Sequence, residues 1–261
     1  MISGKPFLLR IFYVLFGILF ITSCHSTATT PIGKKGTPPL THEAWDTLLK
    51  KHVDENGWVD YEGFIKNQEE LEAYLETLSS SPPATDWPEE AKLAYWINAY
   101  NAFTVKLIVD NYPLKSIREL HTLPFVATIW HEDFFQIGGQ PASLDQIEHS
   151  ILRKEFYEPR IHFAINCASV SCPVLRNEAY EADKLERQLT DQAKRFLASP
   201  IRNNITVDKV ELSRIFQWFK GDFTKEGSLI EFLNQYAPVK IHSDAEVSYL
   251  DYDWGLNVEK H

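Results

Sequence analysis

The segment 160–173, RIHFAINCASVSCP, holds the residues with the most reactive chemistry: His162, Cys167 and Cys172. A thiol beside an imidazole can ionise to a thiolate, so either cysteine paired with His162 is a candidate nucleophile. The same three side chains could supply three ligands to a metal ion. The two cysteines could instead form a disulfide in an oxidising compartment, or be inert thiols. We assign no metal site and expect no cofactor, and the alternatives for the cysteines stay open.

Two carboxylates, Glu148 and Asp222, could orient a catalytic imidazole. In a thiol enzyme the cysteine attacks, the histidine acts as the base, and an acidic side chain holds the ring in place. His149 and His131 are alternative bases, because the approach of His162 to a cysteine is not fixed by the sequence. Each group also has a structural interpretation, since an acid past a helix end is commonly a solvated cap.

Asparagines form the candidate binding set. Asn98 and Asn101 lie three residues apart in the uncharged stretch 94–105, AYWINAYNAFTV, so they share a helix face. A buried amide without partners costs about 1–3 kcal/mol, so both need hydrogen bonds. Together with Asn166 they could bind a peptide or small-molecule ligand in a polar pocket. Alternatively, they tie neighbouring loops to the helix.

Hydrophobic periodicity predicts the elements that must position these groups. We expect helices over 42–52, 66–79, 88–111, 143–156, 180–198, 213–220 and 227–236. We expect a hairpin around Gly138 and Gly139, a second at 205–212, a strand over 161–166 and a closing strand over 238–242. Strand alternation would place His162 and Asn166 on one face. The predicted fold class is α+β, a single mainly helical domain over 42–261 packed on a small antiparallel sheet.

Composition restricts the class of partner. The 261 residues carry a formal net charge of −10, whereas binding to a nucleic-acid backbone needs a basic surface, so no nucleic-acid partner is expected. Three cysteines are too few for a disulfide scaffold. The aromatic content of 13% is enough for one substantial core.

The N-terminus has the features of an export signal. Lys5 and Arg10 precede an uncharged apolar run over 11–21, which at eleven residues is shorter than the ~20 that a membrane-spanning helix needs. We therefore predict that residues 1–23 form a signal peptide. Residues 24–41 are rich in Thr, Pro, Gly and Lys without hydrophobic periodicity, and are predicted to be a flexible tether.

The sequence Ile21-Thr22-Ser23-Cys24 resembles the lipobox of bacterial lipoproteins. That resemblance implies cleavage before Cys24, lipidation of its thiol, and acylation of the new N-terminus, with palmitate as an expected chain. Several acyl chains anchor firmly, at about 0.8 kcal/mol per buried methylene. By analogy with enterobacterial sorting, His25 in place of aspartate disfavours retention in the inner membrane. We expect a lipid-anchored protein of the cell envelope, at the outer membrane.

Five segments in this order resemble the family named domain of unknown function 547. They are AYWINAYNAFTV (94–105), LDQIEHSILR (144–153), RIHFAINCASVSCP (160–173), LSRIFQWFKGDF (212–223) and YDWGLN (252–257), so the resemblance covers about 90–257. There is a weaker resemblance to the papain and transglutaminase superfamily, which implies a divergent fold of that type. In those enzymes the nucleophilic cysteine opens the central helix, whereas the corresponding helix here carries Asn98 and Asn101 and no cysteine.

Two functions follow as expectations. The first is a thiol-dependent hydrolase or acyltransferase acting on peptide or amide bonds, with Cys167 or Cys172 as nucleophile, His162 as base, and Glu148 or Asp222 orienting it. The second is a non-catalytic binding or scaffold module tethered to the membrane, whose polar cleft holds a ligand.

Overall fold

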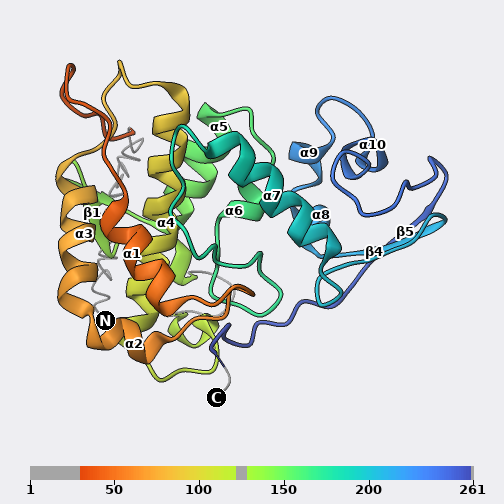
Figure 1. Cartoon of the computed structure of the whole chain (residues 1–261), viewed down its shortest axis with the longest axis horizontal. Helices are drawn as coiled ribbons and strands as arrows, with labels where there is room; N and C mark the ends of the chain where they lie inside the picture. The colour runs from red at the N-terminus through yellow and green to blue at the C-terminus, as the bar shows by residue number, and fades with distance from the viewer. Residues whose placement is uncertain (1–29, 122–127, 260–261) are drawn as a thin grey trace, which may run out of the picture.

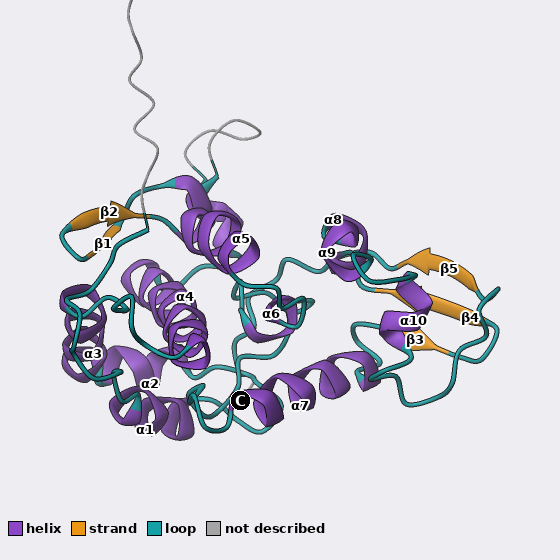
Figure 2. Cartoon of the chain, turned by 90° about the horizontal axis from the view of Figure 1, so that it is seen from above, coloured by secondary structure: helices purple, strands orange, loops and turns teal. Residues whose placement is uncertain are grey.

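A computed structural model describes residues 30–121 and 128–259, so the predicted signal peptide and Cys24 lie outside the described residues. Figure 1 shows helices α1 to α5 gathered at one end of the molecule and strands β4 and β5 at the other. In the view from above in Figure 2, α7 runs between the two ends and α6 lies near the middle. The described part is mainly helical with small sheets, as the α+β prediction requires.

The helical elements have the following bounds. At the helical end they are α1 (Glu43–His52), α2 (Tyr61–Lys66), α3 (Gln68–Ser80), α4 (Glu89–Asn111), the 3₁₀ turns η1 (Ile117–Leu120) and η2 (Ile129–His131), the π-helix η3 (Gln146–Leu152) and α5 (Arg153–Glu155). The remainder are α6 (Ile161–Ala164), α7 (Leu185–Ala198), α8 (Ile215–Trp218), α9 (Lys220–Phe223) and α10 (Leu229–Leu233). Each helix predicted from periodicity has a counterpart among them, although that for 180–198 begins only at Leu185.

Helix α4 is the centre of the helical end. Pro88 precedes it and two glutamates occupy its first turn, where their charge complements the helix dipole. Its uncharged middle is buried on every side, which is why the sequence there lacks a polar face. Despite its 23 residues, α4 is not apolar enough to cross a membrane, and neither is any other helix within 30–121 and 128–259.

The described strands form a hairpin and a three-stranded sheet. Strand β1 (Phe135–Ile137) pairs antiparallel with β2 (Gln140–Ala142), and Gly138 and Gly139 take the positive φ angles of 60° and 73° that a tight hairpin turn requires. In the other sheet β3 (Asn204–Ile205) pairs antiparallel with β4 (Lys209–Leu212), and β4 pairs parallel with β5 (Glu246–Tyr249). Both predicted hairpins are therefore confirmed, but this sheet is mixed rather than antiparallel.

The closing strand predicted for 238–242 is wrong. The side chain of Asn234 binds the backbone of Ile241 on both sides, accepting from its N–H at 2.8 Å and donating to its carbonyl at 2.9 Å. A side-chain amide thus takes the place that a neighbouring strand would occupy. The closing strand is β5 instead, a few residues further along the chain.

The strand predicted for 161–166 is also wrong, because this segment forms the short helix α6. Backbone N–H groups bond three or four residues back, for example Phe163 N to the carbonyl of Arg160 at 2.9 Å and Ile165 N to that of Ile161 at 3.1 Å. All four residues of α6 are buried, so its composition lacks the alternation that separates strand from helix. His162 and Asn166 consequently do not share a strand face.

The buried apolar side chains of residues 30–121 and 128–259 form two clusters, and the aromatic residues contribute to both. The first core contains α1 to α4 and extends to Leu189 and Leu256. The second core contains Phe163 and the residues from Ala193 to Ile241, with α8 to α10 and the three-stranded sheet. Ala164 belongs to the first core and Phe163 to the second, so α6 lies where the two meet.

The segment predicted as a tether is described from residue 30 onward, and there it lies against the domain. Gly33 N–H bonds the carbonyl of Pro83 at 2.8 Å, and the indole N–H of Trp87 bonds the carbonyl of Thr37 at 2.8 Å. Residues 33–37 are therefore held by the domain rather than free of it, which corrects the expected extent of the tether at its C-terminal end.

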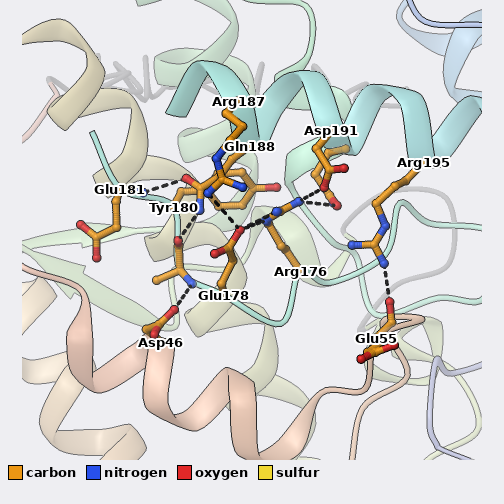
Figure 3. A network of polar contacts seen from close by, with 12 residues as sticks. Asp46, Glu55, Arg176, Glu178, Tyr180, Glu181, Arg187, Gln188, Asp191 and Arg195 are labelled. Carbon is orange, nitrogen blue, oxygen red and sulfur yellow. Dashed lines mark hydrogen bonds and ion pairs between the residues drawn. The ribbon is translucent and has the colours of Figure 1, made fainter. Parts of the chain in front are cut away.

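A network of polar contacts fixes the chain after the second cysteine (Figure 3). The guanidinium of Arg176 is nearly buried and pairs with Glu178 and with Asp191 of α7. The backbone N–H of Ala179 bonds the Asp46 carboxylate of α1 at 3.0 Å. The loop over 173–184 is thus bound to α1 on one side and to α7 on the other, which anchors the cysteine-bearing segment immediately before it.

Candidate functional site

A cavity of about 210 Å³ contains both cysteines and most of the predicted catalytic side chains. It is lined from α4, η2, η3 and α6 on the side of the first core, and from α8 and the C-terminal segment on the other. The lining residues are Tyr100, Thr128, Trp130, His131, Asp145, Glu148, His149, His162, Ile165, Cys167, Cys172, Pro173, Ile215, Trp218, Phe219, Tyr252 and Trp254. An apolar, aromatic cavity with a few titratable groups is the usual character of a small-molecule or active site.

Cys167 presents its sulfur to this cavity amid hydrogen-bonding groups. Its Sγ lies 3.2 Å from Oγ of Ser169 and 3.4 Å from the hydroxyl of Tyr252. Burial alone would raise the pKa of the Cys167 thiol, but hydrogen bonds from Cys172, Ser169 and Tyr252 outweigh it and hold that pKa at about 7. Burial and the cysteine charges raise the pKa of Tyr252 well above its usual value, so its hydroxyl stays protonated and can donate.

Cys172 has the opposite character. It is 3% exposed, and its sulfur accepts a hydrogen bond from the backbone N–H of Cys167 at 2.8 Å. Burial and the adjacent Cys167 raise the pKa of its thiol well above the usual value, so Cys172 remains a neutral thiol. Both cysteines are free, and the disulfide considered from the sequence is not formed in this structure.

The turn that carries Cys167 is strained and braced from outside. Ala168 adopts a φ of 59°, which is uncommon for a residue with a side chain, and it is fully buried. Its N–H bonds the side-chain oxygen of Asn166 at 2.9 Å, and its carbonyl accepts from the N–H of Asn257 at 3.2 Å. Such outliers cluster at functional sites, because only a surrounding structure that fixes them can maintain them.

Glu148 faces the cavity from the π-helix. Residues on a π-helix advance less than 100° each, so neighbours such as Glu148 and His149 can both point to one side, and π-turns are frequent at functional sites. Burial, followed by the charge of Cys167, raises the pKa of Glu148 to about 8. The hydroxyl of Tyr100 donates to Oε2 of Glu148 at 3.3 Å. Among the described residues the carboxylate that bonds His162 is Asp222, not Glu148, so the alternative in which Glu148 orients His162 is not the one found. Glu148 lines the same cavity as Cys167 and responds to its charge.

His162 is held by the other predicted carboxylate. Its Nε2 lies 2.8 Å from Oδ2 of Asp222, and its ring stacks on Phe219 with centroids 4.0 Å apart. Burial lowers the pKa of His162 although Asp222 opposes this, so the ring is neutral at pH 7. Burial would raise the pKa of Asp222, but hydrogen bonds from His162 and Arg153 hold it far below its usual value.

Neither cysteine makes the expected contact with a histidine. In the part of the chain that the structure describes, no hydrogen bond joins Sγ of Cys167 or Cys172 to an imidazole nitrogen. The alternative bases are engaged elsewhere: Nδ1 of His149 lies 2.7 Å from the Arg153 guanidinium, and Nε2 of His131 lies 3.4 Å from Asp145. The thiolate at this site is therefore stabilised by hydroxyl and thiol donors, not by an imidazolium.

The predicted binding asparagines are used within the fold and do not line the cavity. Asn98 bonds the backbone of Tyr180 on both sides, at 2.8 and 3.0 Å. Asn101 donates to the carbonyl of Ala164 at 2.9 Å and accepts from the N–H of Asn166 at 2.8 Å. This corrects their assignment as ligand-binding residues.

Asn166 also departs from its predicted binding role, because its amide donates to the carbonyl of Pro173 at 2.6 Å and closes the cysteine loop. The three asparagines thus hold the loops that position the cavity, which is the second of the interpretations considered from the sequence. The metal-centre interpretation has no support either: among the described residues no three His, Cys, Asp or Glu side chains are grouped as metal ligands.

Sequence reasoning missed Tyr252 and Ser169, whose hydroxyls contact the Cys167 sulfur. It also missed Arg153, which links His149 to Asp222. Ser169 lies two residues from Cys167, a spacing that could have suggested the contact. Tyr252 lies 85 residues away, and the sequence carries no signal for that approach.

Residues 84–197 match the family model described as "Protein of unknown function, DUF547". The chain therefore contains a DUF547 domain, which includes α4, the π-helix, α6 and both cysteines of the cavity. The two other motifs, 212–223 and 252–257, which supply Asp222 and Tyr252, lie outside the matched range. No curated protein and no solved structure matches the chain.

Proposed function

We propose that this protein is a thiol-dependent hydrolase or acyltransferase acting on peptide or amide bonds, with Cys167 as nucleophile. One observation carries the proposal: Cys167, whose thiol has a pKa of about 7, lines the same cavity as Glu148, whose carboxyl group has a pKa of about 8. Between these two values Cys167 is mainly a thiolate while Glu148 keeps its proton. A nucleophile and an acid thus coexist near neutral pH.

This pair can carry out both halves of acyl transfer. The Cys167 thiolate adds to the carbonyl carbon of the substrate, and the amine leaves with the proton of Glu148, giving a thioester. The Glu148 carboxylate then removes a proton from water or from an acceptor amine as that group attacks the thioester and releases Cys167. Cys172 stays protonated, and its hydrogen bond to Cys167 stabilises the negative charge of the thiolate. As a neutral thiol it does not compete for the substrate.

His162 has a positioning role in this proposal instead of the role of base that we predicted. Its Nε2 is occupied by Asp222 and its ring forms part of the cavity wall against Phe219. The proposed reaction is of the kind that papain and transglutaminases catalyse, through a cysteine nucleophile. In this chain the nucleophile would come from the loop after α6, whereas in those enzymes it comes from the central helix.

We further propose that the protein is anchored to the cell envelope, at the outer membrane, through lipid on Cys24. The proposal depends on residues 1–24 as sequence. Since Gly33 is held by Pro83, the chain between Cys24 and Gly33 could extend at most about 30 Å. In an anchored protein the distance from the cavity to the lipid surface could not exceed the length of this segment plus the width of the domain.

The test is acylation of the full-length chain, carrying Cys24→Ser and kept in detergent, by an activated ester such as p-nitrophenyl acetate. We expect one acetyl group on Cys167, detected by mass spectrometry of the digested protein, followed by turnover. Cys167→Ser abolishes acylation, whereas Cys172→Ser is the matched control and keeps it. Glu148→Gln leaves acylation by this good leaving group intact and slows deacylation by about 10²–10⁴-fold, the range for a lost general base.

Acylation that persists in Cys167→Ser would overturn the proposal, as would an acetylated wild-type chain that never turns over. The second outcome favours the alternative, a non-catalytic binding module. The observation behind that alternative is the aromatic wall of the cavity, in which Trp218, Tyr252 and Trp254 pack together with centroids 4.6 to 5.9 Å apart. Such a wall can hold a ligand without any chemistry at the cysteine.

A further inference from the structure

The two free cysteines are arranged as a reactive thiol with a second thiol behind it. Cys167 is partly exposed in the cavity, whereas Cys172 is buried next to it. The backbone folds back between them, since Cys172 N–H bonds the carbonyl of Ser169 at 3.1 Å, and this turn brings the Cys172 sulfur to 2.8 Å from the Cys167 nitrogen. The mechanism proposed above needs a proton-donating neighbour but gives Cys172 no reaction of its own.

We propose that Cys167 and Cys172 form a hydroperoxide-reactive pair, in which Cys167 is oxidised and Cys172 converts the product into an intramolecular disulfide. This inference does not depend on the proposed hydrolase activity. It assigns a modification site that reacts with hydrogen peroxide or a small organic hydroperoxide, entering through the cavity that opens onto Cys167.

The first step oxidises one sulfur. The Cys167 thiolate attacks one oxygen of the hydroperoxide, the O–O bond breaks, and the leaving hydroxide or alkoxide takes a proton to become water or an alcohol. Cys167 is then a sulfenic acid. Hydrogen bonds from Ser169 and Tyr252 favour the thiolate form that this step requires.

The second step forms the disulfide. The Cys172 sulfur, after losing its proton, attacks Sγ of Cys167; the S–O bond breaks, and the hydroxyl leaves with that proton as water. The net change is one hydroperoxide reduced and two thiols oxidised. A small external dithiol reverses it by thiol–disulfide exchange and is itself oxidised to its disulfide. While the disulfide persists, Cys167 has no thiolate and cannot act as a nucleophile in the cavity.

Hydrogen peroxide is the probe for the test, applied to the full-length Cys24→Ser chain in detergent, which retains Cys167 and Cys172 as its thiols. We expect loss of two hydrogen atoms from the intact mass, disappearance of both alkylatable thiols in parallel, and full recovery with dithiothreitol. The digest should place the disulfide within one peptide, because no basic residue separates the two cysteines.

Variants assign the two roles. Cys172→Ser should gain one oxygen atom and react with dimedone, because the sulfenic acid no longer has a partner. Cys167→Ser should slow thiol loss by about tenfold or more, since the remaining thiol is buried and neutral. Tyr252→Phe, which leaves both sulfurs in place, should slow the first step while still giving the disulfide.

The proposal fails if both thiols of the Cys24→Ser chain stay alkylatable after peroxide treatment, or if the disulfide joins two molecules. It also fails if folded Cys172→Ser, with an unchanged circular dichroism spectrum, accumulates no sulfenic acid. Acylation of Cys167 by an ester is unaffected by these outcomes, so failure here leaves the proposed hydrolase standing and can be distinguished from its failure.

Discussion

Replacing Tyr252 with phenylalanine should raise the pKa of the Cys167 thiol and so reduce its reactivity at neutral pH. The Tyr252 hydroxyl lies 3.4 Å from Sγ, and it is one of three side-chain donors that hold this pKa at about 7 against the effect of burial. A hydrogen bond to a charged group contributes about 1.5–3 kcal/mol, and we take the lower value because the contact is long.

That value corresponds to about one pKa unit, since 1.36 kcal/mol shifts a pKa by one. The Cys167 thiol should then titrate near 8 instead of about 7. At pH 7 the thiolate fraction falls from about one half to about one tenth, so alkylation slows roughly fivefold at that pH. Above about pH 9 both proteins are ionised and their rates converge.

The assay is the rate of iodoacetamide alkylation of Cys167 between pH 5 and 10, followed by mass spectrometry of the peptide that carries it. Tyr249→Phe is the matched control, because it removes the same hydroxyl from β5, outside the cavity. Its midpoint should equal that of the wild type. If Tyr252→Phe titrates at the wild-type midpoint, hydroxyl donation does not stabilise the thiolate and our account of the site is wrong.

Three further predictions concern stability and location. Asn101→Leu should lower the free energy of unfolding by about 1–3 kcal/mol in a urea melt, because two buried backbone groups lose their partner; an unchanged melt would contradict this. Burial lowers the pKa of His42 to about 4, whereas in the unfolded chain it is near 6.5. The unfolded chain therefore takes up a proton more readily, and the free energy of unfolding falls by about 3 kcal/mol as the pH drops from 6.5 to 4. His42→Gln should flatten the dependence of unfolding free energy on pH in that window, and an equally steep curve would refute it. Cys24→Ser should release the protein from membranes into the alkaline wash, and material that stays bound would rule out the lipid anchor.

The long elements could be predicted from the sequence because their signals are local. Helix α4 has a proline before it, acids in its first turn and a long uncharged stretch, and the hairpin at Gly138 needs the positive φ angles that glycine allows. Segment 161–166 lacked such a signal. Its apolar residues are buried on all sides between the two cores, so burial removed the periodicity that distinguishes helix from strand.

The site was predictable in its residue types but not in its pairings. The sequence indicated Cys167, His162 and Asp222, and the contact between the last two is present at 2.8 Å. The donor Tyr252 comes from a distant segment, and Glu148 is carried into the lining of the cavity by a π-helix. A contact between residues so far apart in the chain produces no pattern in the sequence. A π-helix, which has one extra residue in a helical turn, does not change the hydrophobic periodicity enough to be recognised.

The coupling between Cys167 and Glu148 leads to a last prediction. Burial is the main reason that the pKa of Glu148 is raised to about 8, and the Cys167 charge is the next. Cys167→Ser removes that charge, so the pKa of Glu148 should fall by about one unit, a typical interaction between two charges across a protein cavity, while burial keeps it above its ordinary value. Infrared titration of the protonated carboxyl, identified by its loss in Glu148→Gln, measures the change.

An unchanged Glu148 titration in Cys167→Ser would mean that the two groups do not sense each other's charge, and the acid-base pair would have to be abandoned. If the shift occurs, it has a direct consequence for acyl transfer. Once the amine has left with the proton of Glu148, the sulfur is part of a neutral thioester and its charge is gone from the cavity, so the pKa of Glu148 is lower than in the free enzyme. The carboxylate therefore stays ionised after acylation, which is the form that must take a proton from the attacking water or acceptor amine in the second half of the reaction.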